Sequence, residues 1–241
     1  MTAPNVSNPT RSAATANQVR LPRTAALGPG RGEQPRLLID APAGAAEIYL
    51  HGATVTSWVP RGGAEVIFTS RQAVFDGATA IRGGIPLCLP EFGAGINGDA
   101  VPKHGWARIA PWRLRTVTST DDGGVRALLS VSRDHLMALC EIQIGETLRL
   151  GLSLRNDGTE PRTVEAAAHT YLSVHDVTAS LVSGLAGASY SDNLARSPQE
   201  LRQVQDGDVR ITGPVDRIYD SAEPVTVTDP GHRRAIHIDK R

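Results

Sequence analysis

The stretch ETLRLGLSLRN, Glu146 to Asn156, is the clearest structural signal in the chain. Four leucines alternate with polar residues or glycine across it, at positions 148, 150, 152 and 154. Because successive side chains of a β-strand point to opposite sides, this period of two predicts a strand with one buried and one solvated face. The stretch therefore favours a sheet in which one side of each strand packs on a core.

The segments on either side of this strand have the same character. VRALLSVS from Val125 and HLMALCEIQI from His135 read as neighbouring strands, between a DDGG turn at 121–124 and an NDGTEP turn at 156–161. No amphipathic helix of twelve or more residues is evident, and only SPQELRQV, from Ser197, has the composition of a helix start. Short strands with frequent turns predict an all-β protein, a large antiparallel sandwich or a barrel.

The first 35 residues differ from the rest of the chain. They are rich in Ala, Thr, Asn, Pro, Gly and Arg, and no acidic residue precedes Glu33. This composition is typical of a disordered tail, with an organellar transit peptide as the alternative. We therefore predict a disordered segment over 1–35 and a β-sandwich domain over 36–241.

Composition limits the possible partners and compartment. Basic and acidic residues are equal at 25 each, which gives no reason to expect nucleic acid or an anionic membrane as a partner. Two cysteines, Cys88 and Cys140, fit a reducing cytoplasm better than a disulfide framework, and their surroundings suggest no metal site. The scarcity of aromatic residues argues against a large interface. We expect a soluble, cytoplasmic monomer that acts on a small molecule.

A glycine-rich stretch at the centre of the chain, Ile81 to Trp112, carries several cations. Glycine and proline recur too often there for a long helix or a central strand, so its charged side chains are expected on turns or strand ends. Two guanidinium groups suit a phosphate or a carboxylate, whereas the alternative is a set of solvated loop charges. The charged side chains of this stretch that we single out are Arg82, Lys103, His104 and Arg108.

One histidine has unusual neighbours. His169 follows three alanines, Ala166 to Ala168, and small residues beside a polar one leave space for a ligand. The alternative is a core histidine that bonds to a neighbouring strand. From the residues alone, both interpretations stay open.

Six segments of the chain together resemble the hexose-6-phosphate mutarotases, the glucose-6-phosphate 1-epimerase branch of the aldose 1-epimerase superfamily. The resemblance covers roughly 36–241 and implies the large antiparallel β-sandwich of the galactose mutarotase type. In chain order the segments are HGATVTSWVPRGGAEVIFTS, IRGGIPLCLPEFG, PKHGWARIAPW, AAAHTYLSVHDV, GLAGASYSDN and PVDRIYD.

The resemblance also implies an activity and a role for each candidate residue. The α and β anomers of a hexose 6-phosphate would interconvert by ring opening and reclosure, without metal or organic cofactor. His169 would be the general acid, and His104 would face the sugar hydroxyls or the ring oxygen. Asp216 would hold a sugar hydroxyl. The 6-phosphate would be held by Arg82 and Arg108, with Lys103 as a further cation.

One departure from the family pattern concerns the general base. The resemblance places it on a glutamate beyond a segment like HRRAIHIDKR, and this sequence stops at Arg241. A chain lacking its last strands, recruitment of another carboxylate, and a sugar-phosphate-binding protein without turnover are three explanations, of which we favour the first. An aldose 1-epimerase for unphosphorylated sugars is a further alternative. Glu165 and Glu91 are the nearest substitutes, but four residues of strand separate Glu165 from His169 by roughly 13 Å.

Overall fold

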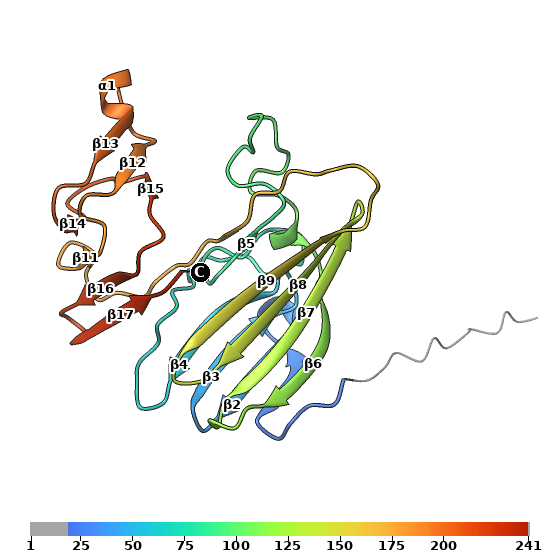
Figure 1. Cartoon of the computed structure of the whole chain (residues 1–241). Helices are drawn as coiled ribbons and strands as arrows, with labels where there is room; N and C mark the ends of the chain where they lie inside the picture. The colour runs from blue at the N-terminus through green and yellow to red at the C-terminus, as the bar shows by residue number, and fades with distance from the viewer. Residues whose placement is uncertain (1–18, 241) are drawn as a thin grey trace, which may run out of the picture.

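The structure, a computed structural model, describes residues 19–240. The first part of the chain forms two antiparallel four-stranded sheets that face each other (Figure 1). The first sheet has the order β1-β2-β3-β4 and the second the order β6-β7-β8-β9. Their strands are β1 (Ala25–Pro29), β2 (Pro35–Ala41), β3 (Gly44–Tyr49), β4 (Thr54–Pro60), β6 (Arg113–Ser119), β7 (Val125–Arg133), β8 (Leu136–Ile144) and β9 (Leu148–Asn156).

The sandwich encloses one main hydrophobic core. Leu37 and Ile48 from the first sheet and Leu129 and Ile142 from the second are fully buried in the same cluster. Alternation within each strand directs these side chains inward, and their burial supplies the main stabilisation of the two layers. The predicted antiparallel sandwich is confirmed.

β9 shows the predicted alternation, but its leucines are only partly buried. Leu150 lies opposite Ile142 of β8, which is fully buried, whereas Leu154 is 39 % exposed. β9 is the last strand of its sheet, so in the described part of the chain no further strand pairs with its outer edge. A period of two identifies the inward face of a strand, whereas its degree of burial depends on neighbours.

The N-terminal prediction needs correction. β1 pairs along its whole length with β2, and the short 3₁₀ helix Arg31–Glu33 follows it. The backbone N–H of Arg31 donates to the Tyr49 hydroxyl at 2.9 Å, and its guanidinium lies 4.3 Å from the centre of the Phe75 ring. The prediction of disorder is therefore wrong for 25–34. The side chains of this segment show little strand pattern, and backbone hydrogen bonds to β2 hold β1 in place. Residues 1–18 of that prediction lie outside the described residues.

After β9 the chain first forms β10 (Ala167–Ala168), which pairs with β5 (Leu87–Cys88). It then forms two small sheets, which we call the C-terminal region (residues 181–238) (Figure 1). A domain predicted as one sandwich over 36–241 is thus a sandwich followed by a smaller β-region. One sheet has the order β14-β11-β16-β17 and the other β13-β12-β15. The strands are β11 (Leu181–Ser183), β12 (Ser189–Asp192), β13 (Arg202–Val204), β14 (Val209–Arg210), β15 (Arg217–Asp220), β16 (Val225–Asp229) and β17 (Arg234–Ile238).

Helices are few and short. The predicted helix start at Ser197 is confirmed as the N-cap of α1 (Pro198–Leu201), a single turn with proline at its start. A 3₁₀ turn, Ala107–Ile109, lies in the glycine-rich stretch. Within residues 19–240, each helix is too short to cross a membrane.

Arg234 of β17 fastens the C-terminal region to the sandwich. Its guanidinium donates to the carbonyl oxygens of Glu65, at 2.8 Å, and Ser173, and its Nε lies 3.4 Å from Asp229 Oδ2. Asp229 is fully buried and also accepts from His232 Nδ1 at 2.7 Å. A buried carboxylate that accepts from an arginine and from a histidine therefore marks the junction between the two parts.

Candidate functional site

Two short strands bring the candidate residues together. β5 (Leu87–Cys88) pairs with β10 (Ala167–Ala168), and the His169 N–H donates to the Pro86 carbonyl oxygen at 2.9 Å. Tyr171 N–H continues the ladder to the Gly84 carbonyl oxygen at 2.9 Å. The segment that carries His169 is thereby held against the stretch that carries the arginines.

A cavity of about 180 Å³ opens between these segments. Four of the six residues predicted for the site line it, and Lys103 and Asp216 do not. The lining residues are Ala80, Ile81, Arg82, Pro86, Cys88, His104, Arg108, His169 and Tyr171.

The two histidines face each other across this cavity. The His104 and His169 rings are perpendicular, with centroids 6.0 Å apart. His169 is exposed and stacks on Tyr171 at 4.9 Å, so it is not the satisfied core histidine of the alternative interpretation. An exposed imidazole beside a cavity is free to exchange a proton with a ligand.

His104 occupies a constrained backbone position. Its φ of 65° and that of Gly105, 68°, are both left-handed, and a Cβ at Gly105 would lie 2.1 Å from the Leu89 carbonyl oxygen. Burial of the ring, followed by the charges of Arg108, His169 and Lys103, lowers the pKa of His104 below its usual value. At neutral pH the ring is therefore uncharged.

Both arginines are available to an anion. Within residues 19–240, neither Arg82 nor Arg108 has a carboxylate oxygen within 4.0 Å. Arg108 donates one N–H to the Lys103 carbonyl oxygen at 2.7 Å, and its buried Nε has no hydrogen-bond partner in this part of the chain. A buried donor without a partner is costly, and the guanidinium that carries it lines the cavity, where its other N–H groups suit an anion.

Lys103 and Asp216 are placed elsewhere. The Lys103 side chain is exposed. Its carbonyl oxygen accepts from the Arg108 guanidinium, and its charge helps to lower the pKa of His104. Asp216 lies in the C-terminal region, where its Oδ1 accepts from Asn193 Nδ2 at 3.0 Å. The structure does not bring Asp216 to the cavity.

The two glutamates weighed as substitute bases belong to a second cavity, of about 230 Å³. Glu91 and Glu165 line it together with Asp99. Glu165 Oε2 accepts from the Phe92 N–H at 3.2 Å. Among the described residues, no carboxylate lines the cavity that contains His169.

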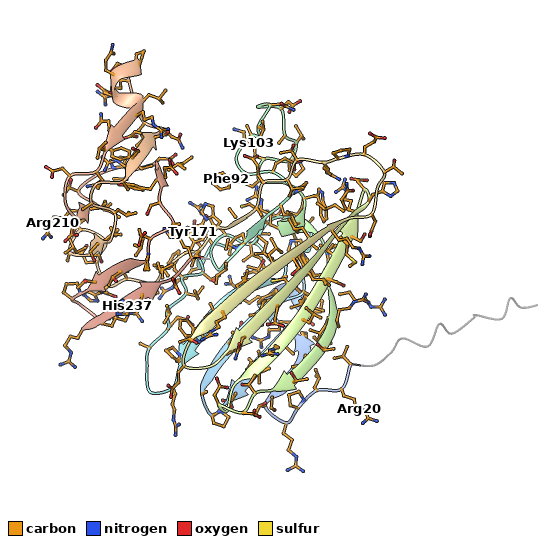
Figure 2. The ribbon with its side chains drawn as sticks, viewed as in Figure 1. Arg20, Phe92, Lys103, Tyr171, Arg210 and His237 are labelled. Carbon is orange, nitrogen blue, oxygen red and sulfur yellow. The ribbon has the colours of Figure 1, made fainter. Side chains whose placement is uncertain are left out.

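Sequence reasoning missed Tyr171 and Cys88. Tyr171 lies two residues after His169, so the strand period places both on one side, which was the available signal. In Figure 2 it lies where the sandwich approaches the C-terminal region, below the loop that carries Phe92 and Lys103. Cys88 is buried in the cavity wall, and burial raises the pKa of its thiol. The thiol therefore contributes shape rather than charge.

The fold and the site together define an antiparallel β-sandwich protein with a cationic, histidine-containing cavity. Residues 35–241 match the family model described as aldose 1-epimerase. The chain therefore belongs to the aldose 1-epimerase family, as the resemblance of its motifs implied.

Two relatives are named "Putative glucose-6-phosphate 1-epimerase". The protein of Cenchrus ciliaris is 31 % identical over 214 residues, and that of Escherichia coli K12 is 30 % identical over 192 residues. These matches cover 81 % and 76 % of this chain. The chain spans 63 % and 62 % of the lengths of these relatives.

A solved structure shows the same fold. The mutarotase-type protein YeaD of Salmonella typhimurium superimposes with a TM-score of 0.79 at 26 % sequence identity. The match covers 91 % of this chain and 74 % of that protein. The sandwich and the small sheets thus form the fold of this family.

Proposed function

We propose that the cavity binds a hexose 6-phosphate and that the chain interconverts its α and β anomers, as a glucose-6-phosphate 1-epimerase. The observation that carries the proposal is the convergence of His169, His104 and two unpaired guanidiniums on one cavity. The names of the relatives support the same substrate class. Without the arginines, the site would suit an unphosphorylated aldose.

The chemistry assigns a step to each imidazole. His169 donates a proton to the ring oxygen as the bond between that oxygen and C1 breaks, and the anomeric hydroxyl gives its proton to solvent water. After rotation of the free aldehyde, the same oxygen attacks the opposite face and returns its proton to His169, while the carbonyl oxygen takes a proton back from water. Neutral His104 donates a hydrogen bond to a sugar oxygen and keeps the ring oriented.

The phosphate contact would come from the arginines. Arg82 and Arg108 present planar donor arrays that remain charged at any working pH. Lys103 adds a nearby positive charge that strengthens the attraction for a dianion. This arrangement favours the phosphorylated sugar over the free sugar.

A second candidate function rests on the missing acceptor. Because no carboxylate lines this cavity among the described residues, the anomeric proton has no evident base there. A site that binds sugar phosphate without turnover has the same cations and histidines. The two functions differ in turnover and share the ligand.

Anomer exchange measured by NMR tests the proposal. We expect faster magnetisation transfer between the anomeric protons of glucose 6-phosphate than between those of glucose, and loss of this acceleration in His169→Ala. Line broadening by binding without exchange would favour the second function. Equal losses for both sugars when Arg82 and Arg108 are replaced by alanine would overturn the phosphate assignment. Arg202→Ala, an exposed arginine of the C-terminal region, is the matched control.

We further propose that the protein acts in the cytoplasm as a monomer. Its two cysteines, Cys88 and Cys140, are both free and buried, which is compatible with a reducing compartment. Sedimentation equilibrium at micromolar concentration tests the monomer: a mass near 25.6 kDa is expected, and twice that mass would contradict it.

A further inference from the structure

The loop that carries His104 is closed by a reciprocal pair of hydrogen bonds. The His104 backbone N–H donates to the Gly93 carbonyl oxygen at 2.7 Å, and the Gly93 N–H donates to His104 Nδ1 at 3.1 Å. The Phe92 ring packs edge-on against the imidazole at 5.1 Å. We call Phe92, Gly93 and His104 the loop neck.

These bonds determine where the imidazole carries its proton. A backbone amide can only donate, so the Nδ1 atom that receives the Gly93 N–H must be unprotonated. The neutral ring then holds its proton on Nε2. In a charged imidazole, Nδ1 would carry a proton, so the Nδ1–H and the Gly93 N–H would be two donors facing each other.

Glu165 holds the other side of the loop neck. Its Oε2 accepts from the Phe92 N–H at 3.2 Å, and its own N–H donates to the Pro90 carbonyl oxygen at 2.8 Å. Glu165 thus joins the segment that leads to His169 to the peptide that precedes Gly93. It also faces the second cavity, away from the reacting sugar.

We propose that Glu165 is a positioning residue that, through Phe92 and Gly93, locks His104 as a neutral hydrogen-bond donor at Nε2. This proposal rests on the proposed function in one respect: the group that accepts the hydrogen bond from His104 Nε2–H is a sugar oxygen. The charged groups that face His104 are Arg108, Lys103 and His169, all cationic or neutral, and they act in the same direction. His169 then carries out the proton transfer, and His104 keeps its proton on Nε2.

Long-range ¹⁵N–¹H correlation spectra of the full chain labelled at histidine test the lock directly. At pH 7.5 we expect the His104 signals of a neutral ring protonated on Nε2, in the wild-type chain and in Glu165→Gln, whose amide oxygen can still accept from Phe92. In Glu165→Ala we expect averaging between the two tautomers. Protonation of His104 at Nδ1 in the wild type, or an unchanged Nε2 lock in Glu165→Ala, would overturn the proposal.

Anomer exchange separates positioning from base catalysis. Loss of orientation predicts a rate decrease of between about 10- and 100-fold in Glu165→Ala and near wild-type exchange in Glu165→Gln. Equal losses in the two variants would show that Glu165 acts through its charge or proton and would contradict the positioning role. Glu91→Ala is the control, because it removes a carboxylate from the same second cavity and the Glu91 side chain has no hydrogen bond to the loop neck among the described residues.

The spectra also show which proposal has failed, the interconversion of anomers or the positioning of His104 by Glu165. A chain that shows no exchange acceleration but keeps the Nε2 lock would contradict turnover and retain the positioning of His104. If Glu165→Ala does not fold, Glu165→Leu, which keeps most of the side-chain volume but removes the acceptor for the Phe92 N–H, takes its place in both measurements.

Discussion

The sandwich and the C-terminal region are both built from antiparallel strands, yet they differ in how much they bury. The main core cluster draws its buried members from residues 37–144. In the described part of the chain after Ile144, only Leu185, Tyr190, Val209 and Val227 are buried apolar residues. Ladder hydrogen bonds are therefore enough to form a sheet, whereas a core requires a second layer over the same face.

Polar contacts take a larger share in the C-terminal region. The Tyr219 hydroxyl donates to Gln205 Oε1 at 2.7 Å, and the Arg217 guanidinium lies 4.5 Å from the centre of the Tyr190 ring. Such contacts contribute less per residue than burial of a leucine. We therefore expect the two regions to differ in their sensitivity to substitution.

The largest difference is expected for side-chain truncation. Leu129→Ala removes a fully buried side chain at the centre of β7 and should lower the free energy of unfolding by about 4 kcal/mol. Val204→Ala in β13, where the side chain is 62 % exposed, should change it by less than about 0.5 kcal/mol. Urea denaturation followed by circular dichroism measures both, and similar losses would contradict the comparison.

The junction between the regions gives the next effect. Arg234→Ala removes the guanidinium partner of a fully buried Asp229 and should destabilise the C-terminal strands by about 3 kcal/mol. Hydrogen exchange should then accelerate in β16 and β17 and stay unchanged in β7. Arg202→Ala, which breaks an exposed pair with Asp220, is the control and should cost less than about 1 kcal/mol. Uniform acceleration across the chain would show that the regions unfold as one.

Acidification should lower the free energy of unfolding through protonation of His104. Burial, with the charges of Arg108 and His169, lowers the pKa of His104 from 6.5 in the folded chain, so the unfolded chain binds the proton more readily. This contribution to stability is complete above about pH 6.5 and is lost as the pH falls through the folded-state pKa. We expect a weaker pH dependence of unfolding in His104→Gln. His237→Gln in the C-terminal region is the control, and an equal change there would contradict the assignment.

The smallest effect is expected at Asp216. Because this carboxylate bonds to Asn193 and does not line the cavity, Asp216→Asn should change the dissociation constant for glucose 6-phosphate by less than about twofold. NMR titration measures it. A tenfold weakening would show that the C-terminal region reaches the ligand when it binds.

The sequence could predict the strands whose side chains alternate over a core. β7, β8 and β9 were evident for this reason, and α1 was evident from its proline-containing start. β1 was missed because an edge strand is held by its backbone, which leaves little trace in side-chain type. The division into a sandwich and a C-terminal region was also missed, since local patterns do not record which faces become covered.

The site was predictable in part. Resemblance of the motifs named Arg82, His104, Arg108 and His169, and all four line one cavity. The same reasoning set Glu165 aside as a base from strand spacing alone. Its bond to the Phe92 amide depends on the path of a distant loop, so no local pattern could indicate it.

The closed loop neck has a consequence for how this surface can vary. Gly93 and His104 bond to each other, and the tip from Ile96 to Asp99 between them is exposed. Lengthening such a tip costs little, roughly 0.6 kcal/mol for each doubling of its length. Insertions at Asn97 should therefore leave the imidazole in place, and a fluorescent reporter grafted there would report on the second cavity, which Asn97 lines. The tip of the loop can therefore change in length and sequence while the His104 imidazole keeps its position.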